Sequence, residues 1–208
     1  MNMPISVVYV VDDDVSVCRS LSLLLKSNGY KVEVFNHSKD FLAFKRPAIP
    51  SCLILDVELP DINGLALQIL MEQKKITIPI IFITGHGDIP MSVKGMKGGA
   101  VDFLTKPFNN KTLIKAITQA ISNNKIQIKE SSEISVILER ISTLSPRELE
   151  VFQLVAQGML SKQIAYQRGI TLQTIKVHRG RVMQKMQAKT VTELIDFARK
   201  AGIISPQI

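Results

Sequence analysis

Three runs of consecutive apolar residues constrain the fold of this chain more than any other feature. They are Val7–Val11, Leu53–Leu55 and Ile80–Ile83. A strand that is apolar at every position is typical of a parallel sheet with helices on both faces. Amphipathic stretches separate the candidate strands, so we expect alternating β-α units in a doubly wound α/β domain.

Five strands and five helices are expected to alternate in this first domain. The predicted strands are Ser6–Val11, Lys31–Phe35, Cys52–Asp56, Pro79–Thr84 and Val101–Leu104, and the predicted helices lie near 15–27, 38–44, 64–74, 89–98 and 109–122. In such a domain the site lies where the carboxyl ends of the strands meet.

The pattern changes after residue 122, and we expect a first domain at 1–122, a linker at 123–142 and a second domain at 143–208. The polar run Ser122–Lys125 should break the preceding helix. Apolar residues recur at helical spacing further along the linker, so it should be partly helical. The last segment has no strand signal. The predicted fold class is therefore α/β plus all-α: a five-stranded parallel-sheet domain followed by a four-helix domain.

Charged and hydroxyl side chains follow four of the predicted strands. Asp12–Asp14 follow the first strand, Asp56 ends the third, Thr84 ends the fourth and Lys106 follows the fifth. Clustered carboxylates repel one another unless a cation neutralises them, and a hard divalent ion such as Mg²⁺ suits oxygen ligands. A carboxylate flanked by a metal, a hydroxyl and an ammonium is suited to accept a phosphoryl group.

Each of these residues alone also has an ordinary structural interpretation. Asp13 or Asp14 could cap the first helix, Thr84 could be a simple strand-end hydroxyl, and Lys106 could be a solvated charge. Because the residues fit together in the required order, we favour the functional interpretation.

Five motifs resemble, in their order, the receiver domain of response regulators. They are Val10–Asp14, Leu55–Pro60, Asp61–Gly64, Ile83–Gly87 and Lys106–Phe108.

The resemblance implies a role for each matching residue. Asp56 would accept the phosphoryl group, and Thr84 and Lys106 would bind its oxygens. Phe103 would change rotamer together with Thr84, and the Lys106–Pro107 peptide bond would be cis. The metal, Mg²⁺ or Mn²⁺, would be held by Asp12, Asp13, Asp56 and the backbone carbonyl of Glu58. His86 lies beside the site and could influence the lifetime of the phosphoryl group or be a plain surface residue.

The second domain carries most of the net charge of +8. Residues 143–208 hold 10 Lys and Arg against 4 Asp and Glu, whereas residues 1–122 hold 13 against 11. A short segment with such an excess of basic residues is typical of a nucleic-acid-binding domain, although an ordinary basic surface exposed to solvent would have the same composition.

Helix boundaries in this domain fit a helix-turn-helix. Ser145–Glu148 is a capping box with proline at the first helical position, and Gly158 ends that helix. A short second helix holds Lys162–Ala165, and Gly169 makes the turn. Thr171 should begin a third helix that runs to about Met186, and a fourth helix should span about Thr190–Ala201.

The third helix has one apolar and one polar face. Its apolar stripe should face the core and consists of Leu172, Ile175, Val182, Met183 and Met186. On the polar face, Val177 suits contact with a thymine methyl group and Gly180 allows close approach, as in a major-groove recognition helix. Arg179 lies beside the stripe and should pair with Glu148 or Glu150 of the first helix.

Three segments resemble the LuxR-type helix-turn-helix: Leu144–Val151, Lys162–Ala165 and Thr174–Arg179. With the receiver attached, the whole chain is similar to the FixJ-like group. The resemblance implies base contacts from Lys176, Val177 and Gly180 and phosphate contacts from Thr174 and Arg181. The expected DNA-binding set also includes Lys162, Gln163 and Thr171.

The predicted function is phosphorylation-dependent transcriptional regulation in a two-component system. A sensor histidine kinase would phosphorylate the receiver, and the resulting homodimer would bind double-stranded promoter DNA and activate transcription with RNA polymerase. The chain would be a cytoplasmic regulator with no membrane partner, not an enzyme, and Cys18 and Cys52 would be reduced packing residues. Two alternatives remain open: an aspartyl-phosphate hydrolase, and an interaction protein whose helical domain binds protein.

Overall fold

The computed structural model describes residues 6–85 and 89–204 and divides the chain after Ile128. Residues up to Ile128 form one compact unit, and residues from Lys129 form a second. His86, whose role the sequence left open, lies outside the described residues.

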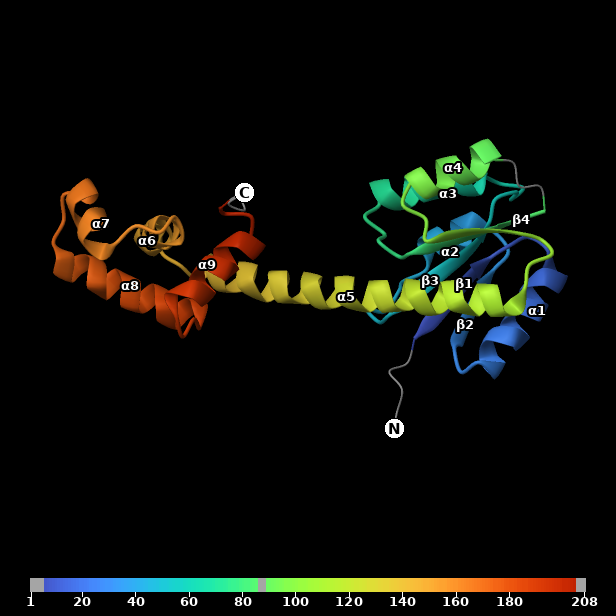
Figure 1. Ribbon diagram of the computed structural model, residues 1–208, viewed down its shortest axis with the longest axis horizontal. Helices are drawn as coiled ribbons and strands as arrows, with labels where there is room; N and C mark the ends of the chain where they lie inside the picture. The colour runs from blue at the N-terminus through green and yellow to red at the C-terminus, as the bar shows by residue number, and fades with distance from the viewer. Residues whose placement is uncertain (1–5, 86–88, 205–208) are drawn as a thin grey trace. The chain divides into compact units, whose positions relative to one another are not determined.

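The first unit contains a five-stranded, all-parallel sheet in the order β2-β1-β3-β4-β5. Figure 1 shows this sheet between helices. The strands are β1 (Val7–Val11), β2 (Lys31–Phe35), β3 (Ser51–Asp56), β4 (Ile80–Thr84) and β5 (Asp102–Thr105). The prediction of a doubly wound parallel sheet is confirmed. Every residue of β1, β3 and β4 is buried, which explains why these strands are apolar between their ends.

Helices cover both faces of this sheet. They are α1 (Val15–Ser27), α2 (Ser38–Ala43), α3 (Gly64–Gln73), α4 (Ile89–Lys97) and α5 (Asn110–Ser142). Alternate strand residues such as Tyr9 and Phe82 pack with α2 and α3, and the residues between them, such as Val10 and Ile83, pack with α1 and α5. Cys18 and Cys52 are both buried and free.

Helix α5 passes through the segment in which the sequence predicted a break. The side chain of Asn124 is buried there and accepts a hydrogen bond from the backbone N–H of Ser51 at 2.9 Å. Its amide also donates to the carbonyl of Thr77 at 3.5 Å. Because these tertiary contacts satisfy the buried amide, they outweigh the weak helix propensity of Ser122–Lys125. The predicted break was wrong.

The second unit is helical and contains α6 (Pro146–Ala156), α7 (Ser161–Arg168), α8 (Leu172–Met186) and α9 (Val191–Lys200). The four-helix domain predicted after the sheet is confirmed. Phe152 of α6, Ile164 of α7, Val182 of α8 and Leu194 of α9 form its core, and Ile137 of α5 packs with them. Across residues 6–85 and 89–204, each helix is too short or too polar to span a bilayer.

Candidate functional site

Three carboxylates converge at the carboxyl edge of the sheet. Strands β1 and β3 are neighbours, with Val11 opposite Leu55, so the next residues, Asp12 and Asp56, come to lie side by side. Oxygen atoms of Asp12, Asp13 and Asp56 all lie within 4.8 Å of one another. Asp12 is fully buried and Asp56 nearly so.

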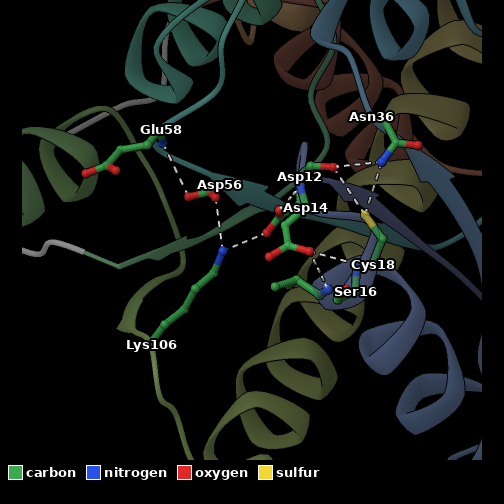
Figure 2. A network of polar contacts seen from close by, with 9 residues as sticks. Asp12, Asp14, Ser16, Cys18, Asn36, Asp56, Glu58 and Lys106 are labelled. Atoms are coloured by element: carbon green, nitrogen blue, oxygen red, sulfur yellow. Dashed lines mark hydrogen bonds and ion pairs between the residues drawn. The ribbon is translucent and has the colours of Figure 1, made fainter.

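Lys106 places its ammonium between two of these carboxylates. Its Nζ lies 2.7 Å from Oδ2 of Asp12 and 3.0 Å from Oδ2 of Asp56 (Figure 2). The Lys106–Pro107 peptide bond is cis, as the resemblance implied. The structure therefore brings together the predicted residues of three different strand ends.

The carboxylate charge exceeds the positive charge provided at this edge by Lys106. Burial raises the pKa of the Asp12 carboxyl, and the hydrogen bond from Lys106 offsets that rise only in part. Burial also acts to lower the pKa of Lys106, but its bonds to Asp12 and Asp56 outweigh this and the net shift is upward. Three carboxylates facing one ammonium are a donor set that fits a hard divalent cation, for which oxygen ligands are preferred.

Asp14 has a structural role that separates it from this cluster. Its carboxylate accepts hydrogen bonds from the backbone N–H groups of Ser16 at 2.7 Å and Val17 at 3.3 Å and so caps α1. The sequence was compatible with either Asp13 or Asp14 as the N-cap of this helix, and in the structure Asp14 is the N-cap. Asp13 remains exposed within the cluster.

Two side chains that the sequence analysis missed hold Asp12 in place. The Nδ2 of Asn36 and the Sγ of Cys18 both donate to the backbone carbonyl of Asp12, each at 3.2 Å (Figure 2). Asn36 directly follows β2, the other neighbour of β1. The sequence signal was that this strand, too, ends in a polar residue at the same edge.

The loop after β3 is fixed by polar contacts of its own. The backbone N–H of Glu58 donates to Oδ1 of Asp56 at 3.3 Å. Asp61 accepts from both the backbone N–H and the hydroxyl of Ser38, at 3.0 and 2.8 Å, and ties the loop to the start of α2. Asn63 caps α3. These contacts order the segment that contains Glu58.

Gly64 begins α3 at a point where a side chain would meet the backbone at the end of β3. A Cβ at this position would lie 2.4 Å from the backbone oxygen of Asp56 and 3.0 Å from the Cα of Val57. Because the obstacle is backbone, it has little freedom to move aside. Glycine is therefore required here for close packing.

Gly64→Ala is expected to lower the free energy of unfolding by about 1–3 kcal/mol, because the added methyl group overpacks against backbone. Thermal unfolding followed by circular dichroism should show a loss of at least about 4 °C in Tm. Gly85→Ala is the control in the same unit, since a Cβ there meets nothing within 4 Å. Equal Tm values for the two variants would contradict the packing role of Gly64.

Thr84 and Phe103 occupy adjoining strands. Thr84 is fully buried at the end of β4, and its backbone oxygen accepts a hydrogen bond from the backbone N–H of Lys106 at 2.7 Å. Phe103 of β5 is partly buried, with its ring centroid 5.9 Å from that of Phe82. A Cβ on Gly95 of α4 would lie 3.2 Å from the ring of Phe82, so α4, Phe82 and Phe103 form one packed group.

In the second unit, α8 has the amphipathic character that the sequence predicted, with one difference. Ile175, Val182 and Met186 are buried, whereas Leu172 is 38% exposed and does not belong to the buried stripe. It lies in the first turn of the helix. Val177 is 45% exposed on the opposite face.

The candidate DNA-binding residues lie at the surface of this unit. All eight of these residues are exposed: Lys162, Gln163, Thr171, Thr174, Lys176, Val177, Gly180 and Arg181. Two of these residues also stabilise helix starts: Thr171 accepts from the backbone N–H of Thr174 at 3.1 Å, and Gln163 accepts from that of Leu160 at 2.8 Å. A Cβ on Gly180 would meet nothing within 4 Å, so α8 is open to close approach there.

The predicted partner of Arg179 was wrong. Arg179 donates to the hydroxyl of Ser161 on α7 at 3.1 Å. Glu148 instead binds Lys185 at 2.6 Å, and Glu150 binds Arg147 and Arg168 at 3.0 and 2.9 Å. The helical wheel correctly placed Arg179 off the outer face, but it could not identify which neighbouring helix was in reach.

Glu148 anchors α8 to the start of α6. The hydrogen bond from Lys185 and that from the backbone of Ser145 lower the pKa of the Glu148 carboxyl to about 2. Lys185 also donates to the carbonyl of Thr143 at 2.9 Å. Lys185 is thus bound to two groups of the protein, whereas Lys176 and Arg181 are exposed on the surface of α8.

Comparisons with known proteins match both units. Residues 8–118 match the model of the response regulator receiver domain, and residues 142–198 match that of the luxR family of bacterial regulatory proteins. The chain is 43% identical to nodulation protein W of Bradyrhizobium diazoefficiens over 95% of this chain and 87% of that protein. It is 40% identical to the transcriptional regulatory protein FixJ of Rhizobium meliloti, over 94% and 96%.

A solved structure extends the similarity to the fold. The response regulator StyR superimposes with a TM-score of 0.82 at 40% sequence identity, covering 94% of this chain and 98% of that one.

Proposed function

Since the chain belongs to the response regulators that join a receiver domain to a LuxR-type DNA-binding domain, we propose that Asp56 is its phosphoacceptor and that α8 is its recognition helix. The chain is a phosphorylation-dependent transcription regulator of a two-component system. We assign residues 1–122 to the receiver, 123–142 to the linker and 143–208 to the DNA-binding domain.

The observation that carries the proposal is the convergence of Asp12, Asp56 and Lys106 within hydrogen-bonding distance. A lone carboxylate at a strand end would need none of these partners. A nucleophilic carboxylate beside an ammonium and a second buried carboxylate has the groups that phosphoryl transfer requires.

Each residue of the site has a distinct task in that transfer. An oxygen of Asp56 attacks the phosphorus of a phosphohistidine on the sensor kinase, so the O–P bond forms as the N–P bond breaks and the histidine nitrogen recovers its electron pair. Lys106 and the hydroxyl of Thr84 stabilise the negative charge on the phosphoryl oxygens. Asp12, Asp13, Asp56 and the carbonyl of Glu58 would hold Mg²⁺ or Mn²⁺. When bound, the metal supplies positive charge to the same oxygens.

Phosphorylation is proposed to change the packed group of α4, Phe82 and Phe103. Once Lys106 and Thr84 bind the phosphoryl oxygens, β5 and α4 shift and Phe103 turns inward. The altered face favours a receiver homodimer, which pairs two recognition helices on adjacent half-sites of promoter DNA.

On the DNA, Lys176, Val177 and Gly180 are proposed to face the bases. Thr174 and Arg181, with Lys162, Gln163 and Thr171, are proposed to lie along the phosphate backbone. RNA polymerase is the proposed partner in activation, and the cytoplasm the proposed compartment. The relative FixJ of Rhizobium meliloti is named as a transcriptional regulatory protein, which supports this role.

Beryllofluoride with Mg²⁺, a mimic of the aspartyl phosphate, tests the whole proposal. We expect the mass in solution to double on light scattering, because activation pairs the receivers. Binding to a duplex selected by the protein from a random pool should tighten at least about tenfold. A monomer whose DNA affinity does not respond to beryllofluoride would contradict phosphorylation control. Duplex binding that is insensitive to salt would contradict the DNA-binding role.

A further inference from the structure

The recognition helix ends in a backbone conformation that its C-cap residue does not favour. Gln187, which follows α8, has a φ of 53°, in the left-handed region. Helix α7 ends in the same conformation, but with Gly169 at the cap, where the absence of a Cβ removes the cost. A glutamine at this position needs compensation from its surroundings.

Arg140 of α5 supplies that compensation. Its Nη1 donates to the backbone carbonyl of Met186 at 3.1 Å, and its Nη2 donates to Oε1 of Gln187 at 2.8 Å. The first bond satisfies a carbonyl at the helix end, and the second fixes the side chain of the strained cap residue. The guanidinium also places a positive charge at the negative end of the helix dipole.

Other contacts of the same segment surround this cap. The Arg140 guanidinium lies 5.9 Å from the ring centroid of Phe197 on α9. Lys200 of α9 binds Glu133 of α5 at 3.2 Å, and Lys185 of α8 binds the carbonyl of Thr143 at 2.9 Å. All of these residues belong to the unit that begins at Lys129. The last turns of α5 are therefore joined to both α8 and α9.

We propose that Arg140 is a positioning residue for DNA recognition: it caps α8 from the linker helix and so fixes the end of the recognition helix against α5. The proposal rests on the DNA-binding role proposed above for α8. It makes the linker helix part of the apparatus that orients the base-contacting side chains. Arg140 itself need not touch DNA for its loss to weaken sequence recognition.

The direct test is amide hydrogen exchange in the full-length protein. In wild type, the N–H groups of Gln187 and Ala188 bind carbonyls of the last turn of α8. Arg140→Ala should speed exchange at these two amides at least about tenfold, because a charged hydrogen-bond donor is lost. Exchange in α6 should stay unchanged. Arg140→Lys keeps the charge but cannot reach both acceptors, so an intermediate rate is expected.

Arg147→Ala is the matched control, because it removes an exposed arginine of the same unit that binds the half-buried Glu150. It should leave exchange at the end of α8 unchanged. If Arg140→Ala left the rates at Gln187 and Ala188 as in wild type, or raised rates equally throughout α6–α9, the positioning role would be overturned.

DNA binding provides a second readout, with the beryllofluoride-activated protein and a duplex selected from a random pool by wild type. The ratio of affinities for the selected and a scrambled duplex should fall at least about fivefold in Arg140→Ala and stay constant in Arg147→Ala. An unchanged ratio in Arg140→Ala would overturn the proposal. Failure of wild type to bind any duplex would instead overturn the DNA-binding role, while the exchange result would still report on the cap.

Discussion

Asp56→Asn is expected to reduce phosphorylation by acetyl phosphate and Mg²⁺ at least about a thousandfold, because the variant lacks the nucleophilic oxygen. The side chain of Asp56 is nearly buried, and one of its oxygens lies 3.0 Å from the Lys106 ammonium. Asparagine is close to aspartate in size and retains one oxygen to accept the Glu58 N–H. The variant should therefore fold, with Lys106 still bound to Asp12 at 2.7 Å.

The measurement is the intact mass of the protein after incubation with acetyl phosphate and Mg²⁺. Asp40→Asn, which changes an exposed carboxylate on α2, serves as the control and should gain the phosphoryl group at the wild-type rate. Equal labelling of Asp56→Asn and wild type would show that another residue accepts the phosphoryl group. The role of Asp56 would then have to be abandoned.

The sheet was predictable from sequence because burial on two faces leaves a strong signal. In β1, Tyr9 faces one helical layer and Val10 the other, so no position tolerates a polar residue until the strand ends. The residue that follows is then at the carboxyl edge by topology alone. This is why the sequence alone predicts that Asp12, Asp56 and Lys106 lie together.

Contacts between segments distant in sequence were not predictable in the same way. Asn124 has low helix propensity, and its hydrogen bonds with Ser51 and Thr77 explain why α5 continues through it. The partner of Arg179 likewise depended on which helix lies beside α8. A helical wheel gives the direction of a side chain but does not identify its neighbour.

The capping contacts also show that local sequence predicts local contacts but not contacts between distant segments. Ser145 and Glu148 form the capping box that the local motif predicted. Arg140 caps α8 from a different helix, and no local motif marks such a pair. Long-range polar contacts of this kind depend on the packing angle of two helices, which short sequence windows do not contain.

Two basic residues on α8 are expected to differ in what they contribute to DNA binding. Lys176→Ala should lower the affinity for a selected duplex about ten- to a hundredfold and that for a scrambled duplex far less, because a contact with a base edge carries sequence information. Arg181→Ala should weaken both duplexes alike and reduce the slope of log K against log salt by about 1, as the loss of one phosphate contact does.

Titrations of fluorescent duplexes at several salt concentrations measure both effects. Lys189→Ala removes the same charge from an exposed position beyond the end of α8. It should leave the ratio of affinities for the selected and scrambled duplexes unchanged, and it should change the slope of log K against log salt by only a fraction of one unit. Lys185→Ala should behave differently, because Lys185 binds Glu148 and the carbonyl of Thr143. This substitution should mainly lower Tm and should affect sequence recognition less. If Lys176→Ala weakened both duplexes equally, Lys176 would be a phosphate contact, and the face of α8 that enters the groove would have to be reassigned.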